Sequence, residues 1–224
     1  MSIKGADIRN IAVIGHSGEG KTSVCEAILF NGKATDRLGK VTEGTTVTDC
    51  DEQEIARKMS ISLGVAYAMW EGVKLNLLDV PGFYDFEGEE NEALRAAGGA
   101  LIVTGATGTL SVGAEKAIDK CLKNKIPMVV FINGVDKENA DYAGTVAALK
   151  QKYAGKIAPI QIPLMEGNKM VGYVNALKET CYHFADEAKK QPVPIPEELK
   201  GTLAEMQASL TETAAENDEA LLDK

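Results

Sequence analysis

The sequence is poor in the residues that build covalent or metal-bound frameworks. It has four cysteines in 224 residues, and they stand far apart without a Cys-x-x-Cys pair: Cys25, Cys50, Cys121 and Cys181. This spacing argues against the disulfide framework of a small secreted domain and against a zinc site. We therefore expect reduced thiols in a cytoplasmic protein, in which the cysteines act as small buried apolar residues.

Basic charge and long apolar runs are also scarce. The 24 Lys and Arg residues are outnumbered by 33 Asp and Glu residues, which gives a net charge of -9. The chain thus has no basic excess that would bind nucleic acid non-specifically. It also has no apolar run of the roughly eighteen residues that a membrane span requires. We expect a soluble monomer that by itself binds neither nucleic acid nor membrane.

Short apolar runs bounded by turn residues are plentiful. They lie at 8–14, 63–70, 73–80, 100–104 and 127–133, and each is typical of a strand. Helical patterns lie between the later runs, at about 88–97, 113–123 and 139–153. A length of 224 residues suits one large α/β domain, or one domain with a small appendage. The alternation of strand and helix predicts a doubly wound sheet.

The runs at 63–70 and 73–80 differ from the others, because only Glu71 and Gly72 separate them. Such a short connection is typical of a hairpin. We therefore expect a mostly parallel sheet with one antiparallel edge strand and helices on both faces. Ligands of such sheets bind at the carboxyl ends of the strands, where Asp79 and Asn133 emerge.

Two segments depart from this pattern. Residues 31–60, here called the long loop, lack apolar periodicity, and a loop of this length is usually functional or disordered. After residue 154, short apolar runs with turns expected at Pro163 and Gly167 indicate two or three strands. The Pro-rich run 191–196 then leads into an acidic amphipathic helix that begins at about Glu197. We divide the chain into a core at 1–154 and a small α+β extension at 155–224.

The most informative segment follows the first predicted strand. It has the pattern Gly15-x-x-x-x-Gly20-Lys21-Thr22, and an amphipathic helix begins directly after it. Glycines let the backbone curl tightly enough to aim consecutive N–H groups at phosphate oxygens, and the helix adds its positive end. Lys21 can reach the β- and γ-phosphates, and the Thr22 hydroxyl can bind Mg²⁺. The predicted phosphate loop comprises Gly15, His16, Ser17, Gly18, Glu19, Gly20, Lys21, Thr22 and Ser23.

Two later motifs indicate which nucleotide is bound. Asp79, at a strand end, can bind Mg²⁺ through water, and the N–H of Gly82 can sense a γ-phosphate. Asn133 and Asp136 follow the strand at 127–133. A carboxylate here suits guanine, because it accepts hydrogen bonds from the N1–H and the 2-amino group, a donor pair that adenine lacks. Taken alone, this pair is typical of a capped turn, but in this order after a phosphate loop it predicts a guanine-nucleotide site.

With these motifs in order, the sequence resembles the G domain of translational GTPases, and in particular that of elongation factor G. The resemblance covers nearly the whole chain and rests on GHSGEGKT at 15–22, DCDEQEIARKMSIS at 49–62, LLDVPGFYDF at 77–86 and FINGVDKENADY at 131–142. It implies a P-loop NTPase G domain that binds GTP or GDP with Mg²⁺ and hydrolyses GTP when the ribosome engages it. It also implies that Ser60 binds the metal beside Thr22 and Asp79, with Thr45, Thr46 and Thr48 as alternatives to Ser60.

The chain departs from the family's motifs at several positions, and two of these departures bear directly on hydrolysis and on base binding. Phe83 stands where the family has the His that orients the attacking water, so we expect very slow hydrolysis unless another group takes that role. Lys21 and Gly82 remain to stabilise the transferred phosphoryl group. Gly134 stands where the family has a Lys that stacks on the purine, and Lys137 is expected to point from the wrong position to replace it. Base affinity should be lower by about 0.5–2 kcal/mol.

Three functions are compatible with these motifs. The first is a slow GTPase, and the second is a guanine-nucleotide switch that binds its partner through other domains and scarcely hydrolyses. The third is an unrelated ATPase, which Asn133 and Asp136 disfavour. The resemblance also implies that the family's inserted subdomain and base loop continue beyond Lys224. We therefore expect an N-terminal piece of a longer protein, with 155–224 as the incomplete beginning of that subdomain. A complete small protein is the alternative.

Overall fold

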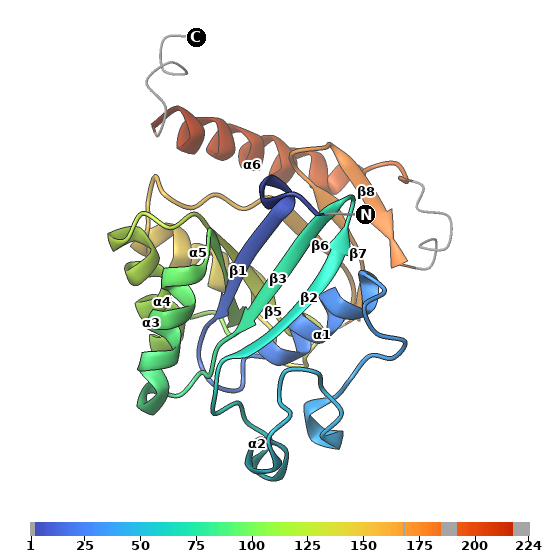
Figure 1. Ribbon diagram of the computed structural model, residues 1–224. Coiled ribbons are helices and arrows are strands. Elements are labelled where there is room, and N and C mark those ends of the chain that lie inside the picture. The colour runs from blue at the N-terminus through green and yellow to red at the C-terminus, as the bar shows by residue number, and fades with distance from the viewer. Residues whose placement is uncertain (1–2, 168, 185–191, 217–224) are drawn as a thin grey trace. The chain divides into compact units, whose positions relative to one another are not determined.

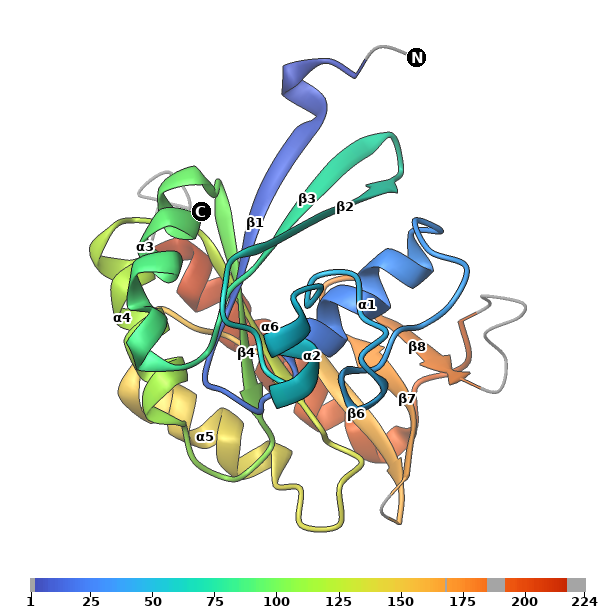
Figure 2. The ribbon, with the colours of Figure 1, turned by 60° about the horizontal axis from the view of Figure 1, so that its bottom comes forward.

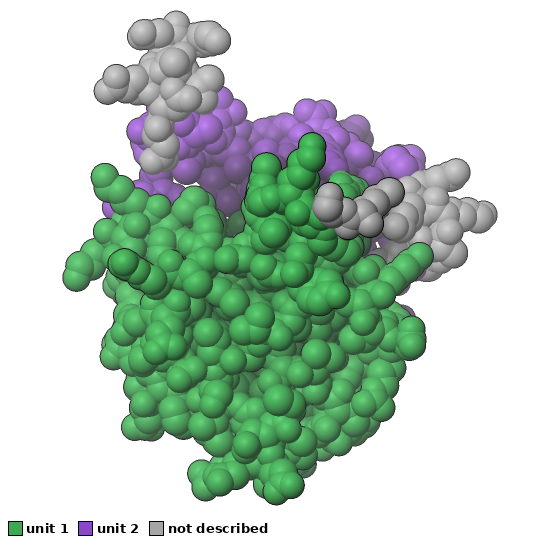
Figure 3. Space-filling view, viewed as in Figure 1, with its two compact units in different colours: residues 1–105, 110–133 green, residues 106–109, 134–224 purple. Residues whose placement is uncertain are grey.

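The computed structural model describes residues 3–167, 169–184 and 192–216. Its contacts divide the chain into two units, one formed by residues 1–105 and 110–133 and the other by residues 106–109 and 134–224 (Figure 3). Each unit has its own sheet, five-stranded in the first and three-stranded in the second. Within the described residues, no helix combines the length and the hydropathy needed to cross a lipid bilayer.

The first unit is built on a mixed sheet with the strand order β2-β3-β1-β4-β5. After a short 3₁₀ helix, η1 (Gly5–Asp7), the strands are β1 (Ile8–Ile14), β2 (Gly64–Trp70), β3 (Val73–Asp79), β4 (Gly99–Gly105) and β5 (Met128–Asn133). Strand β1 runs parallel to β3 and β4, and β4 runs parallel to β5. Only the edge strand β2 is antiparallel. The predicted mixed sheet is confirmed, and the strand bounds agree to within one residue.

Helices cover both faces of this sheet, as predicted. Helix α1 (Lys21–Asn31) contacts β1, β2 and β3, whereas α3 (Glu87–Ala96) contacts β1 and α4 (Val112–Lys123) contacts β4. Figures 1 and 2 show α1 on one face and α3 with α4 on the opposite face.

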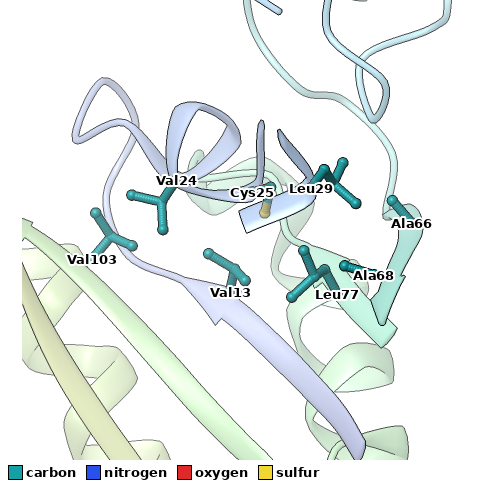
Figure 4. Close-up of a cluster of buried hydrophobic side chains, with 8 residues drawn as sticks. All are labelled: Val13, Val24, Cys25, Leu29, Ala66, Ala68, Leu77 and Val103. Carbon is teal, nitrogen blue, oxygen red and sulfur yellow. The ribbon is translucent and has the colours of Figure 1, made fainter. Parts of the chain in front are cut away.

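The core between α1 and the sheet fixes the start of α1 beside the ends of the central strands. The side chains that meet there are Val13, Val24, Cys25, Leu29, Ala66, Ala68, Leu77 and Val103 (Figure 4). The cysteines are free, and three of them are buried as expected, but Cys50 is exposed. Packing of α1 against β1 and β3 holds both ends of the loop that joins β1 to α1.

The long loop is more regular than its sequence led us to expect. It contains a 3₁₀ helix, η2 (Val41–Glu43), and a short helix, α2 (Glu52–Arg57). Helix α2 begins with a capping box, in which Asp51 accepts a hydrogen bond from Gln53 N at 2.7 Å and Glu54 accepts one from Asp51 N at 3.1 Å. The spacing Asp51-x-x-Glu54 is the signal for this cap, and the absence of apolar periodicity hid it.

The second unit contains α5 (Tyr142–Lys152), the antiparallel strands β6 (Gln161–Glu166), β7 (Lys169–Asn175) and β8 (Thr180–His183), and α6 (Glu197–Glu216). Helix α6 packs its apolar side on one face of the small sheet. This confirms the expected short strands and the helix from Glu197. Residue 191 of the Pro-rich run and residues 217–224, over which the acidic helix was expected to continue, lie outside the described residues.

Two local predictions for this unit were wrong. Pro163 is not in a turn but pairs with Tyr173 in the edge strand β6, where a residue without an N–H is tolerated. The helix predicted from 139 begins at Tyr142, because Asp141 caps it by accepting a hydrogen bond from Gly144 N at 2.7 Å.

Candidate functional site

The predicted phosphate loop joins the end of β1 to the first residue of α1, and its shape requires glycine at specific positions. Gly20 caps α1 with φ at 92°, in the left-handed region. A Cβ on Gly20 would collide with the side-chain amide of Asn133, and one on Gly15 would collide with the carbonyl oxygen of Val103. Val103 of β4 and Asn133 at the end of β5 therefore lie directly against the backbone of the loop.

Two side chains hold this loop in shape. The Asn133 amide, at the end of β5, donates to the carbonyl oxygen of Glu19 at 2.8 Å. The Glu19 carboxylate turns back and accepts a hydrogen bond from the N–H of His16 at 2.8 Å. The loop is therefore braced both from the neighbouring strand and from within.

Lys21 brings a cation to the inside of the loop. Its side chain is buried, and its ammonium donates to the carbonyl oxygen of His16 at 3.1 Å. Burial lowers the pKa of Lys21, and the carboxylates of Asp79 and Glu19 oppose that shift. A buried cation with so few partners is suited to bind an anion that enters the loop.

The segment after β3 lies directly on the loop. A Cβ on Gly82 would lie 2.6 Å from the backbone N of Ser17 and 2.8 Å from the carbonyl carbon of His16, and it would also collide with the Lys21 ammonium. Only glycine at position 82 permits this approach. The backbone of Gly82 is thus placed where it can respond to whatever the loop binds.

Hydroxyls and carboxylates from four segments meet beside Lys21. Thr48 donates to Asp79 Oδ2 at 2.7 Å, Ser60 donates to Asp49 Oδ1 at 2.7 Å, and the hydroxyls of Thr22 and Ser60 lie 3.3 Å apart. The structure therefore brings together the three predicted metal-binding residues. Thr48 lies in the same cluster, whereas the Thr45 hydroxyl accepts a hydrogen bond from Lys40 N in the long loop.

Asp79 is the most perturbed acid of this cluster. It is 1% exposed, and burial raises its pKa to about 6, against the opposing effect of hydrogen bonds from Thr48 and Thr22. Burial also raises the pKa of Asp49. Asp79 Oδ1 is buried without a hydrogen-bond partner among the described residues. An unpaired buried carboxylate oxygen near several hydroxyl oxygens fits a hard cation such as Mg²⁺.

Sequence reasoning missed Asp49 and two buried glutamates. Glu26, on α1, is 1% exposed and accepts hydrogen bonds from Gly39 N at 3.0 Å and Val47 N at 2.7 Å. Glu54 is 3% exposed, and it accepts hydrogen bonds from the N–H groups of Ile61 and Ser62 at 2.9 and 3.1 Å, besides the one from Asp51. These carboxylates tie the long loop to α1 and to the residues around Ser60. The signal for Glu26 was its place within the apolar run VCEAIL.

The remaining predicted residues are more exposed. Phe83, just before η3 (Tyr84–Phe86), is 41% exposed, so it does not pack beneath a neighbouring segment. The next residue, Tyr84, places its ring 5.9 Å from the ring of His16. Ser23 is exposed on α1. Asp136 is exposed in the turn that begins the second unit.

No group of three His, Cys, Asp or Glu side chains that could hold a metal ion occurs within the described ranges. The cluster around Asp79 has two carboxylates, and its other ligand atoms are hydroxyl oxygens. A cation there would therefore need water and phosphate oxygens to complete its shell, which is the usual state of protein-bound Mg²⁺.

The fold and the loop define a P-loop NTPase domain of the G-domain type. Residues 6–219 match the model of the elongation factor Tu GTP-binding domain, and the chain belongs to this family. It is 34% identical over 219 residues to an elongation factor G-like protein of Mycobacterium tuberculosis, covering 97% of this chain and 30% of that protein. It is 31% identical over 218 residues to elongation factor G of Mycoplasma pneumoniae, covering 96% of this chain and 32% of that protein.

A crystal structure of a protein from Thermus thermophilus is also similar, with a TM-score of 0.89 and 34% identity over 98% of this chain and 33% of the other. The chain thus spans about a third of the length of these relatives. The matches confirm the predicted fold and the resemblance to the G domain of elongation factor G.

The raised pKa of Asp79 predicts a pH-dependent loss of stability in metal-free protein. Between pH 4 and 6 the folded state binds this proton more tightly than the unfolded state, so the free energy of unfolding falls as the pH rises. A shift from 3.8 to about 6 corresponds to a loss on the order of 3 kcal/mol. Asp79→Asn should remove this loss in denaturant unfolding measured with a chelator. The exposed Asp36→Asn is the control, and parallel pH profiles of Asp79→Asn and the parent would contradict the prediction.

Proposed function

We propose that this chain binds GTP and GDP with Mg²⁺ and hydrolyses GTP slowly, as the G domain of an elongation factor G-like protein. The observation that carries the proposal is the meeting of three groups at one loop. The Lys21 ammonium is buried inside it, the Gly82 backbone touches it, and the Asp79 carboxylate lies near enough to oppose the lowering of the Lys21 pKa by burial. A γ-phosphate in the loop would contact the first two.

Mg²⁺ would be held by the hydroxyls of Thr22 and Ser60 and, through water, by Asp79. The unpaired Oδ1 of Asp79 and the 3.3 Å separation of the two hydroxyls support this assignment. When bound, the metal neutralises phosphate charge. Asp49 would act through Ser60, because it accepts a hydrogen bond from the Ser60 hydroxyl and so leaves the lone pairs of the Ser60 oxygen directed toward the cation.

The base would be recognised by the motif that begins at Asn133. Asp136 would accept hydrogen bonds from the N1–H and the 2-amino group of guanine, and its exposure leaves it accessible. Asn133 would act on the phosphate loop, because its amide already donates to Glu19 O. Under this proposal the phosphate loop of residues 15–23, with Asn133 and Asp136, forms the nucleotide-binding set.

Hydrolysis would rest on electrostatic stabilisation alone. The loop N–H groups, Lys21 and the N–H of Gly82 would stabilise charge on the transferred phosphoryl group. Phe83 cannot orient water, because its ring neither donates nor accepts a conventional hydrogen bond. Its exposure favours a second candidate function, a guanine-nucleotide switch with little or no hydrolysis.

We extend this proposal to the two parts of the chain and to the cellular role of the protein. We propose that residues 1–154 form the GTPase core and residues 155–224 the beginning of the family's inserted subdomain. The longer protein would act on the ribosome in translation, in the cytoplasm, through domains beyond this chain. The chain itself would be monomeric and would not bind nucleic acid or membrane directly.

The nucleotide assignment predicts a guanine-selective site that depends on Asp136. In Mg²⁺, unlabelled GTP should displace fluorescent GDP from the parent chain, and ATP should not. Asp136→Ala should weaken GDP binding at least about tenfold, because hydrogen bonds to a charged group contribute about 1.5–3 kcal/mol. Glu138→Ala, which removes an exposed acid from the same segment, should bind like the parent. Displacement by ATP as readily as by GTP would instead support the ATPase.

If Phe83 is the reason for slow GTP hydrolysis, a histidine at this position should make hydrolysis faster. Phe83→His should raise the rate of single-turnover GTP hydrolysis at least about tenfold, since a positioned imidazole typically contributes 10²–10⁴-fold. Phe83→Ala should not, because it only removes an exposed ring. Phosphate release measured at equal saturation with GTP separates this effect from binding. Equal rates for Phe83→His and Phe83→Ala would contradict the assignment.

A further inference from the structure

The turn after β5 places one lysine in an unusual position. Gly134 has φ at 70°, in the left-handed region that favours glycine, and Lys137 N donates to Gly134 O at 3.2 Å. The turn folds the side chain of Lys137 back over Gly134. A Cβ on Gly134 would lie 2.9 Å from Cε, 3.1 Å from Cδ and 3.4 Å from Nζ of Lys137.

The sequence led us to expect that Lys137 points from the wrong position to replace the family's lysine, and the structure shows that its stem lies against Gly134, the residue that stands in that lysine's place. The Lys137 stem occupies the space that a side chain at position 134 would take. The sequence concealed this contact, because the direction of the stem depends on the positive φ at Gly134. The two positions act together: glycine at 134 makes room, and lysine at 137 fills it.

We propose that Lys137 is a binding residue for the purine that Asp136 recognises. This proposal rests on the proposed function, because a carboxylate that accepts hydrogen bonds from the guanine edge brings the ring close to this turn. Gly134 offers the ring no side chain, whereas Lys137 offers an apolar stem that ends in a cation. Lysine stems cover apolar surfaces while the ammonium stays in water, and an ammonium above an aromatic ring is attracted to its π-face.

The exposure of Lys137 supports a role in purine binding and argues against a role in stabilising the fold. Lys137 is exposed, and the atoms of its stem that approach Gly134 belong to no buried core. Its removal should cost the folded chain little, because surface changes of this kind usually have small effects on stability. A binding role and a structural role are therefore separable by experiment.

The test measures the dissociation constant of fluorescent GDP in Mg²⁺ for the parent chain and three variants. Lys137→Ala should raise it about tenfold, which corresponds to about 1.4 kcal/mol. Lys137→Met, which keeps the stem and loses the charge, should raise it about threefold. Lys150→Ala, which removes another exposed lysine from the same unit, should stay within about twofold of the parent. The thermal unfolding midpoint should be the same for all four proteins.

Two results would overturn the inference about Lys137 and leave the proposed function standing. One is a Lys137→Ala variant that binds GDP within about twofold of the parent while the parent still prefers GTP to ATP. The other is equal loss of affinity in Lys137→Ala and Lys137→Met with a lowered unfolding midpoint in both, which would assign Lys137 to the stability of the turn. A parent chain that binds no GDP, or that ATP displaces as well as GTP does, would overturn the inference together with the proposed function.

Discussion

The site depends on how closely other parts of the first unit approach the backbone of the phosphate loop. The Asn133 amide fills the place of a Cβ at Gly20, and Gly82 lies against Ser17 and His16. A side chain at position 20 or 82 would push these segments apart. This close packing keeps the Lys21 ammonium inside the loop. It also places the segment after β3 in contact with that ammonium. Gly82 and the residues that follow are thus the first to be displaced if a bound group changes the shape of the loop.

Buried carboxylates form the second constraint, and their hydrogen bonds distinguish their roles. A buried charge is costly unless hydrogen bonds satisfy it. Glu26 and Glu54 are satisfied by backbone N–H groups, so they are anchors of the long loop. Asp79 accepts hydrogen bonds from hydroxyl groups and still has one oxygen without a partner among the described residues, and burial raises its pKa. Of these three acids, Asp79 is therefore the one suited to interact with a cation.

Much of the fold and the membership of the site could be predicted from the sequence, because both depend on local signals. Apolar runs and turn residues located the strands, and the resemblance to the family implied that Thr22, Ser60 and Asp79 would meet. Asp49 could not be predicted, because a carboxylate that accepts buried hydrogen bonds looks, in sequence, like a solvated one. Glu26 gave one signal, its place within an apolar run, but the sequence does not reveal which groups its carboxylate binds. The contact between the Lys137 stem and Gly134 could not be predicted for a different reason. It depends on the backbone torsion of the residue that directly follows β5, and spacing does not reveal it.

We propose above all that the bare backbone of residues 15–22 holds the phosphates of a guanine nucleotide. The most direct measurement is the amide spectrum of the isotope-labelled chain by nuclear magnetic resonance during titration with GDP and Mg²⁺. The largest shifts should fall on the N–H groups of residues 15–22 and on the turn at 134–137, and ADP should not reproduce them. Unchanged amides in the phosphate loop, or the same changes with ADP, would contradict this proposal.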